Sequence, residues 1–237
     1  MVRIDALCLS LQLEPGSARL TENRRPLKSR GTGWARTLAA GLAQAGVAPD
    51  AVSAASVVLA GLGFVAFWQV ADADGPMRAI WLIAAAAAIQ LRLLVNLLDG
   101  MVAVEHGKGG PHGPIWNELP DRIADILFLV GSGYALRIYD PMFGPVLGWA
   151  AAVLAILTAY VRELGRGLGV AADFIGPGAK PHRMAMLTAA CVAAAAMTLA
   201  GSDWAMAALW LGLALIVLLA LITVVRRTVR LAERLRA

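Results

Sequence analysis

The chain has 237 residues, of which 59% are hydrophobic, a net charge of +5 and a mean hydropathy of +0.68. This composition excludes an ordinary soluble domain and indicates a polytopic helical membrane protein. No basic stretch is interleaved with aromatic residues, so a nucleic-acid partner is excluded too. The two cysteines, Cys8 and Cys191, form no CxxC motif or Cys/His cluster, which excludes a disulfide framework and a zinc site.

The N-terminal part divides into two predicted segments. Residues 1–30 are polar and become basic near their end, so we expect a cytoplasmic arm. Residues 31–48 place Trp34, Leu38 and Leu42 at helical spacing, which predicts an amphipathic helix lying in the membrane interface. Gly46 and Pro49 separate this helix from the segment that follows.

Six apolar segments follow, each about long enough to cross a hydrocarbon core of roughly 30 Å. They cover approximately residues 51–71, 79–104, 118–137, 143–164, 183–200 and 204–225. The expected fold class is therefore an all-α integral membrane protein with an N-terminal amphipathic interfacial helix. Its six transmembrane helices form one domain over residues 49–232, and residues 233–237 form a cytoplasmic tail.

Basic residues alternate between the two sides of these crossings. The connections 72–78, 138–142 and 201–203 carry few basic residues, whereas the other connections and the C-terminal end carry many. The latter are Lys108, Arg122, Arg162, Arg166, Lys180, Arg183, Arg226, Arg227, Arg230, Arg234 and Arg236. The positive-inside rule then places both termini and the 105–117 loop in the cytoplasm.

Polar residues concentrate in the stretch 96–125, which holds five of the sixteen acidic residues. These five are Asp99, Glu105, Glu118, Asp121 and Asp125. Asn96 and Asp99 are spaced i, i+3, and Asn117, Asp121 and Asp125 are spaced i, i+4, i+8, so each set lies on one face of a helix. Carboxylates at helix ends inside a hydrophobic protein are expensive, which indicates a functional site.

The oxygens of Asp, Glu and Asn are ligands for hard divalent cations such as Mg²⁺ and Mn²⁺, which often bridge substrate phosphates. Two polar stripes on adjacent helix ends suit one or two such ions, and two ions stabilise both oxygens of a phosphoryl displacement. A spare carboxylate suits deprotonation of a hydroxyl nucleophile. The alternative is a small-molecule transporter, but the acids gather at one surface and no inverted repeat is visible.

The same stretch resembles the signature of the integral-membrane CDP-alcohol phosphotransferases, D-x2-D-G-x2-A-R-x8-G-x3-D-x3-D. Here the run is Asn96-x2-Asp99-Gly100-x2-Ala103-Val104-x8-Gly113-x3-Asn117-x3-Asp121. The spacing is kept throughout, while Asn96, Val104 and Asn117 replace an Asp, the Arg and another Asp. A second register takes Asn117 for the second Gly and Asp121 and Asp125 for the last two Asp. We prefer the first register because it needs no insertion.

The resemblance implies a metal-dependent CDP-alcohol phosphatidyltransferase of phospholipid biosynthesis, in which an alcohol attacks CDP-diacylglycerol and CMP leaves. By position, Asn96, Asp99, Asn117 and Asp121 would surround the ions, Mg²⁺ or Mn²⁺ and two in number. Asp121 would also be the base, and Asp125 is a second catalytic candidate one turn deeper. The substrate side would include Gly100, Ala103 and Gly113.

The relatives and the small-residue helix faces also point to a homodimer among membrane lipids. The expected location is a bacterial inner membrane, with the active site facing the cytoplasm. The three departures from the signature leave open a catalytically degenerate member that binds lipid or nucleotide without turnover.

Four basic residues, Arg162, Arg166, Lys180 and Arg183, flank the connection between the fourth and fifth apolar segments. One interpretation is topology and lipid headgroup contact; the other is substrate binding, because in relatives this region lines the acceptor pocket. The acceptors used in the family are glycerol 3-phosphate, inositol phosphate, inositol, serine and choline. The basic cluster favours one of the phosphorylated acceptors, glycerol 3-phosphate or inositol phosphate. Arg92 lies within the second segment, where we expect it to pair with a neighbouring acid.

Overall fold

The structure is a computed structural model that describes residues 32–46, 49–105 and 113–236. Within these ranges the chain is helical and has no β-strand. A short helix, α2 (Gly33–Gln44), precedes six long ones. These are α3 (Pro49–Asp72), α4 (Gly75–Glu105), α5 (Gly113–Ala135), α6 (Phe143–Gly167), α7 (Lys180–Leu199) and α8 (Ala205–Arg236), with one 3-10 turn, η2 (Leu136–Ile138), after α5. The arm predicted at 1–30 lies outside the described residues.

The long helices coincide with the six predicted apolar segments, and two boundaries differ. Helix α7 begins at Lys180 rather than 183, because Pro181 in its first turn is compatible with a helix start. Helix α8 continues to Arg236, so the basic residues predicted as the end of the last segment and a tail belong to one helix. Arg and Leu are good helix formers, so the end of the apolar segment does not end the helix.

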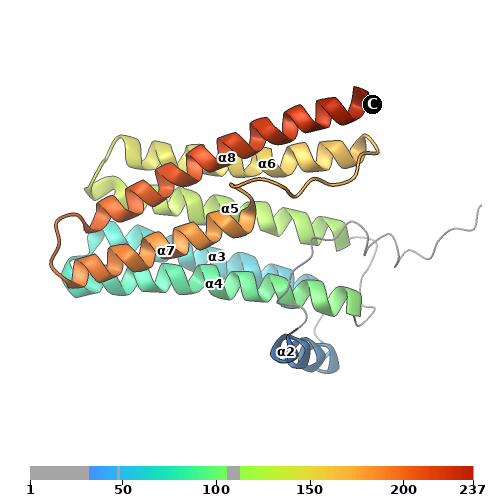
Figure 1. Ribbon diagram of the computed structural model, residues 1–237. Helices are drawn as coiled ribbons and strands as arrows, with labels where there is room; N and C mark the ends of the chain where they lie inside the picture. Colours follow the sequence, from blue (N-terminus) through green and yellow to red (C-terminus); the bar gives the residue numbers. More distant parts are fainter. Residues whose placement is uncertain (1–31, 47–48, 106–112, 237) are drawn as a thin grey trace, which may run out of the picture.

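The six long helices run alongside one another (Figure 1), and their contacts close a ring. Helix α3 packs against α4 and α5, α4 packs against α7, α7 against α8, α8 against α6, and α6 against α5. Helices α4 and α5 face each other with little direct contact. One continuous apolar core includes Leu82 and Ile89 of α4, Phe128 of α5, Leu187 of α7 and Leu209 of α8. The interior of the ring is therefore shared by side chains from every long helix.

Helices α5 and α6 approach each other closely through glycine. A Cβ added to Gly133 would lie 2.7 Å from the Cα of Gly148, and a Cβ on Gly148 would lie 2.8 Å from the carbonyl oxygen of Leu129. In lipid, where no hydrophobic force drives helices together, small residues allow the close packing that holds them.

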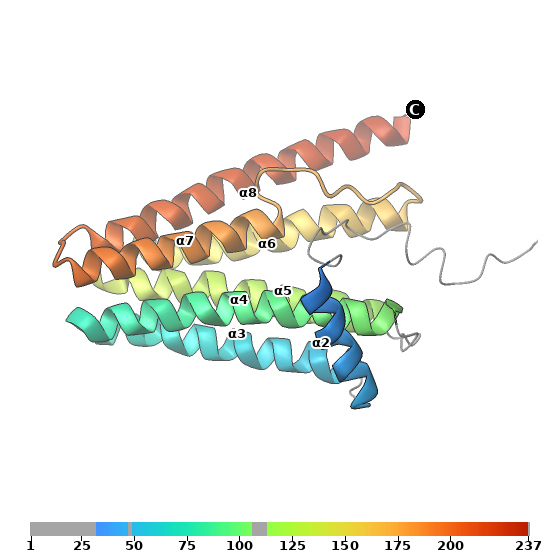
Figure 2. The same cartoon turned by 60° about the horizontal axis from the view of Figure 1, so that its bottom comes forward.

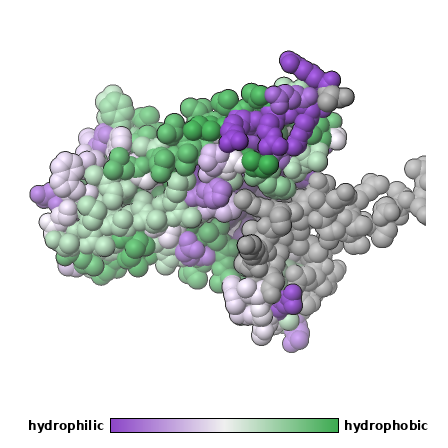
Figure 3. Space-filling model, in the orientation of Figure 1, coloured by the Kyte–Doolittle hydropathy of each residue, from purple (hydrophilic) through white to green (hydrophobic). Residues whose placement is uncertain are grey.

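The outer surface is that of a membrane protein. Among the described residues, five helices are long and apolar enough to cross a bilayer: α3, α4, α6, α7 and α8. Large apolar side chains such as Leu62, Val153, Leu211 and Leu218 are exposed, and hydrophilic residues gather over the C-terminal part of α8 (Figure 3). Such a surface is stable against lipid and not against water. The sixth crossing, by the charged helix α5, stays a prediction.

Helix α2 lies outside the ring and crosses α4 near the C-terminal part of that helix (Figure 2). Ala39 is buried against α4 in a small cluster with Leu97 and Met101, while Trp34 and Leu38 are exposed. The exposed pair is consistent with the predicted interfacial helix, whose location in the membrane interface stays a prediction.

We expect Gly148→Ala to lower the stability of the bundle by about 1–3 kcal/mol, because its new Cβ meets backbone atoms of α5. Thermal unfolding in detergent measures the effect. The control is Gly61→Ala in α3, whose Cβ meets nothing within 4 Å. That change removes a helical glycine and is expected to stabilise by up to about 1 kcal/mol. Equal melting temperatures for the two variants would contradict the close packing of α5 on α6.

Candidate functional site

A group of charged side chains lies inside the ring, near the end where α4 finishes and α5 begins. Helix α4 contributes Arg92, α5 contributes Asp121 and Asp125, and α7 contributes Lys180 and Arg183. Arg92 and Arg183 are among the largest fully buried side chains. Buried charges cost several kcal/mol each unless they are paired, so their partners decide the geometry of this site.

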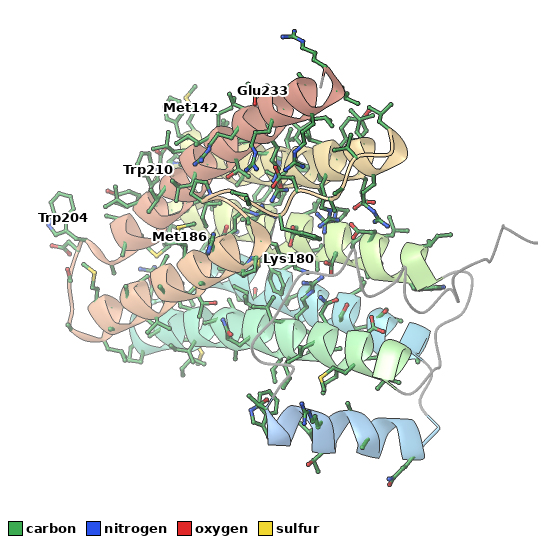
Figure 4. The ribbon with its side chains drawn as sticks, turned by 45° about the vertical axis from the view of Figure 1, so that its right-hand side comes forward. Met142, Lys180, Met186, Trp204, Trp210 and Glu233 are labelled. Atoms are coloured by element: carbon green, nitrogen blue, oxygen red, sulfur yellow. The ribbon has the colours of Figure 1, made fainter. Side chains whose placement is uncertain are left out.

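Asp121 is the centre of the group. Its Oδ1 accepts a hydrogen bond from Arg92, and its Oδ2 lies 2.5 Å from the Nζ of Lys180 and 3.4 Å from a guanidinium nitrogen of Arg122. Figure 4 shows Lys180 at the first turn of α7. One carboxylate thus connects three helices, and the prediction that Arg92 pairs with a neighbouring acid is confirmed.

Asp125 lies one turn deeper on α5 and pairs with Arg183. The Oδ2 of Asp125 is 2.8 Å from a guanidinium nitrogen, and both side chains are 1% exposed. Arg183 also donates to the carbonyl of Gly178 at 2.6 Å and to the hydroxyl of Thr158 at 3.2 Å. Asp125 therefore holds Arg183 in a buried pair that joins α5 to α7.

Arg162 and Arg166 project from α6 towards different surroundings. Arg162 donates to Glu118 of α5 at 2.6 Å and to Glu163 at 2.8 Å, and its guanidinium lies over the ring of Phe174. Arg166 also contacts Glu163, at 2.8 Å, but is 41% exposed. The i, i+4 spacing of the two arginines predicts that both face one phosphate. In the structure both pair with the carboxylate of Glu163, Arg162 with its side chain half-buried and Arg166 with its side chain exposed.

The segment 168–179 fixes the start of α7. After α6 it runs back along α6 and α8 before α7 begins (Figure 1). Arg227 of α8 donates to the carbonyls of Ile175, at 3.0 Å, and Thr158, at 2.6 Å. Thr223 accepts a hydrogen bond from the backbone N–H of Gly178, at 2.8 Å. These bonds set the position from which Lys180 and Arg183 reach α5.

Sequence reasoning missed Thr158, Thr223 and Arg227 as parts of this site. The sequence groups Arg227 with the basic residues of the C-terminal end, yet its side chain is buried, at 6% exposure. Gly178, two residues before α7, is the sequence signal for this close contact: a Cβ there would lie 2.5 Å from the backbone of Ala220 in α8, so the position requires glycine.

The remaining predicted ligands lie on α4 and α5. Asp99 is 6% exposed and accepts a hydrogen bond from the hydroxyl of Ser53 in α3. Asn96 precedes it by about one turn, and Gly100 follows it, on the same helix. Asn117 and Gly113 belong to the first turns of α5, and Ala103 to the end of α4. The side chains of Ala103 and Asn117 lie outside the described part of the structure.

The donor chemistry of Asn96, Asp99 and Asp121 fits a hard divalent cation, since each offers oxygen. Carboxylates are few, however: no three His, Cys, Asp or Glu side chains come together among the described residues. A cation here would rely on Asp99 and on amide oxygens, which are neutral ligands.

Positive charge exceeds negative charge around the site. Six basic side chains share four carboxylates. They are Arg92, Arg122, Arg162, Arg166, Lys180 and Arg183, and the acids are Glu118, Asp121, Asp125 and Glu163. An excess of buried and half-buried cations favours an anionic ligand.

We expect Asp125→Asn or Arg183→Met to destabilise the protein by about 3–5 kcal/mol, because each leaves an unpaired buried charge. The double variant Asp125→Asn/Arg183→Met should recover part of the loss. Thermal unfolding in detergent measures all three. Asp74→Asn is the control, since its pair with Arg78 is exposed and should be worth about 0–1 kcal/mol. Additive single effects in the double variant would contradict a coupled pair.

No protein-family model matches the chain, and no curated protein matches it. Solved structures do. The phosphatidylinositol phosphate synthase of Mycobacterium tuberculosis with CDP-diacylglycerol bound matches with a TM-score of 0.69 and 21% identity, over 83% of this chain and 92% of that one. Its complex with manganese and citrate matches with a TM-score of 0.69 and 22% identity, over 83% and 88%.

The apo form of that synthase matches with a TM-score of 0.64 and 22% identity, over 81% of this chain and 93% of that one. Nearly the whole of the synthase therefore has a counterpart here. The likeness confirms the fold that the signature implies: the chain has the fold of the CDP-alcohol phosphotransferases, represented by a phosphatidylinositol phosphate synthase.

Proposed function

We propose that this protein is a membrane-embedded phosphotransferase that moves a phosphatidyl group from CDP-diacylglycerol to an alcohol and releases CMP. The observation that carries the proposal is Asp121. This carboxylate stands at the last position of the signature and lies inside the ring between α4, α5 and α7. The fold around it is shared with a synthase solved with CDP-diacylglycerol bound.

Asp121 is the proposed base. It takes the proton of the acceptor hydroxyl as that oxygen attacks the β-phosphorus of the donor, and the bond from this phosphorus to the bridging oxygen of CMP breaks. Arg92 and Lys180 hold the carboxylate in one orientation through its two oxygens. Asp125, the second candidate, is fully buried against Arg183, so we assign it a positioning role.

Donor binding is proposed at the ends of α4 and α5. Asn96, Asp99 and Asn117 would hold Mg²⁺ or Mn²⁺, which would polarise the pyrophosphate of the donor. Gly100, Ala103 and Gly113 lie on the cytidine side of the signature, where small residues let a ligand approach the backbone. Ser53 fixes the carboxylate of Asp99 from α3.

The acceptor is proposed to carry a phosphate. Arg162, Arg166, Lys180 and Arg183 belong to a site with more cations than carboxylates, and Arg162 and Lys180 lie near the reacting groups on α5. Charge-assisted hydrogen bonds to phosphate are roughly twice as strong as neutral ones. Glycerol 3-phosphate and inositol phosphate are the acceptors that this chemistry favours.

The proposed setting is a bacterial inner membrane, with six crossings, a homodimer and both termini in the cytoplasm. Two observations support the orientation. The arginines at the C-terminal end of α8 lie at the same end of the ring as the site. The turns at the opposite end carry Asp72, Asp74, Asp140 and Asp203.

The purified protein should release CMP from CDP-diacylglycerol when Mg²⁺ or Mn²⁺ and a suitable alcohol are present. Asp121→Asn should lower kcat by about 10²- to 10⁴-fold, because it removes the base. Since it also takes a carboxylate partner from Arg92 and Lys180, kcat is compared in protein that thermal unfolding shows to be folded. Asp203→Asn, an exposed change at the opposite end of the ring, is the control and should keep full activity. Binding of CDP-diacylglycerol without turnover by any alcohol would make this a degenerate binding member.

A phosphorylated acceptor should be used in preference to its unphosphorylated form. Arg162→Met should raise the KM for the phosphorylated acceptor by roughly tenfold or more, since a hydrogen bond to a charged group is worth about 1.5–3 kcal/mol. Arg137→Met, which breaks an ion pair with Asp72 at the other end of the ring, is the matched control. Equal use of inositol and inositol phosphate would exclude a phosphate site.

A further inference from the structure

A polar pair lies on the outer surface of the ring, where α4 packs against α7 (Figure 1). The side-chain amide of Gln90 donates to the hydroxyl of Thr188 at 2.8 Å, and Gln90 is exposed. On α4, Gln90 follows the exposed residues Ile83 and Ala87 by seven and three positions, so the three share one face of the helix. That face is turned away from the core, and the pair is therefore separate from the charged site inside the ring.

Gln90 lies near the middle of the apolar span Gly75–Val102. At 1.5 Å of rise per residue it is roughly 18 Å along the helix from Val102, while a hydrocarbon core is roughly 30 Å thick. Polar side chains exposed at such a depth are costly and indicate a functional site. The bond to Thr188 uses one of two amide N–H groups, and the second has no acceptor among the described residues.

The polar group that a lipid can bring to this N–H is the carbonyl of an acyl ester, which accepts hydrogen bonds and donates none. In an ordinary bilayer lipid these carbonyls lie at the edge of the hydrocarbon core, far from the middle of α4. A lipid whose phosphates are bound inside the protein is held deeper, and its ester carbonyls are held deeper with them. The depth of Gln90 therefore favours a bound lipid substrate over a lipid of the surrounding bilayer.

The charged site lies at nearly the same level as the polar pair. Arg92 follows Gln90 by two residues, about 3 Å of helix rise, and is buried against Asp121 on the inner side of α4. On α7, Thr188 comes about two turns after Lys180, whose ammonium lies 2.5 Å from Asp121. A lipid with its phosphates at Lys180 passes the first turn of α7 and brings its glycerol esters to the outer surface of α4 and α7.

We propose that Gln90 and Thr188 bind an acyl ester carbonyl of the phosphatidyl donor. Gln90 donates its second amide N–H to that carbonyl, and Thr188 positions the amide by accepting the first. The inference rests on the proposed function and specifies its donor. An ester-linked lipid is bound more tightly than the ether-linked lipid with the same chains, because an ether has no carbonyl.

The first test compares CDP-diacylglycerol with the CDP-dialkylglycerol of equal chain length. The protein is placed in nanodiscs of a diether phospholipid, so that the donor alone carries ester carbonyls, and the Kd is measured by native mass spectrometry. The Kd for the ester-linked donor should be about three- to tenfold lower, the effect of one neutral hydrogen bond. Equal Kd values for the two donors would overturn the proposal.

The second test removes the polar pair. Gln90→Leu and Thr188→Val should raise the Kd for the ester-linked donor to that of the ether-linked donor and leave the latter unchanged. Gln90→Met serves if Gln90→Leu unfolds. Thr198→Val is the matched control at the far end of α7, since the hydroxyl of Thr198 donates to Ala194 of its own helix, at 2.8 Å, and both Kd values should stay the same. An equal rise of both Kd values in the Gln90 variants would overturn the proposal, because it would show a structural role or a contact with a second copy of the chain.

A third measurement identifies the source of the carbonyl. Phosphatidylglycerol with the same ester-linked chains, added in equal amount, should not displace CDP-diacylglycerol. Displacement as effective as that by CDP-diacylglycerol itself would show a site for bilayer lipid in general and overturn the proposal.

Release of CMP separates this inference from the proposed function. Equal Kd values for the two donors together with CMP release would overturn the inference and leave the phosphotransferase intact. A preference for the ester-linked donor that is lost in Gln90→Leu, without CMP release to any alcohol, would support the inference and remove the transfer reaction. Binding of neither donor would overturn both.

Discussion

The structure depends on how a carboxylate is kept inside an apolar ring of helices. Asp121 is stable there because Arg92 of α4 and Lys180 of α7 each bind one of its oxygens. Helices α4 and α5 touch little elsewhere, so this ion pair connects them across the ring. The pair Asp125–Arg183 repeats the arrangement one turn deeper. Together they fix the rotation of α5 relative to its neighbours.

The supporting groups come from parts of the chain far from the signature. Thr158 of α6 binds Arg183 with its hydroxyl and Arg227 with its carbonyl, so one residue joins the deep ion pair to α8. Thr223 and Gly178 bring the start of α7 against the same helix. Helices α6 and α8 carry none of the signature residues, yet their hydrogen bonds hold the start of α7 and Arg183 in place beside α5.

Much of the fold could be predicted from the sequence, because apolar length and loop charge are local properties. The six long helices follow the six apolar segments, and the stripe of Asp121 and Asp125 does face inward. The ion-pair partners of the buried charged side chains could not be predicted, because they depend on which helices become neighbours when the ring closes. The position of Arg92 predicts a neighbouring acid but does not identify Asp121 among the five acids of residues 96–125. The sequence likewise groups Arg227 with the C-terminal basic residues, although the structure buries it. Roles for Asn96, Asp99 and Asn117 still rest on the signature.

Helix α8 has a mechanical consequence. Its 32 residues span about 48 Å, well beyond a hydrocarbon core of roughly 30 Å, and its arginines hold the segment that positions Lys180. A long transmembrane helix adapts to a change in bilayer thickness by changing its tilt. Tilt of α8 would shift Ile175 and Gly178 with it and so move the first turn of α7 relative to α5. A change in bilayer thickness would therefore change the position of Lys180 relative to Asp121, because the tilt of α8 is transmitted through the backbone of residues 168–179.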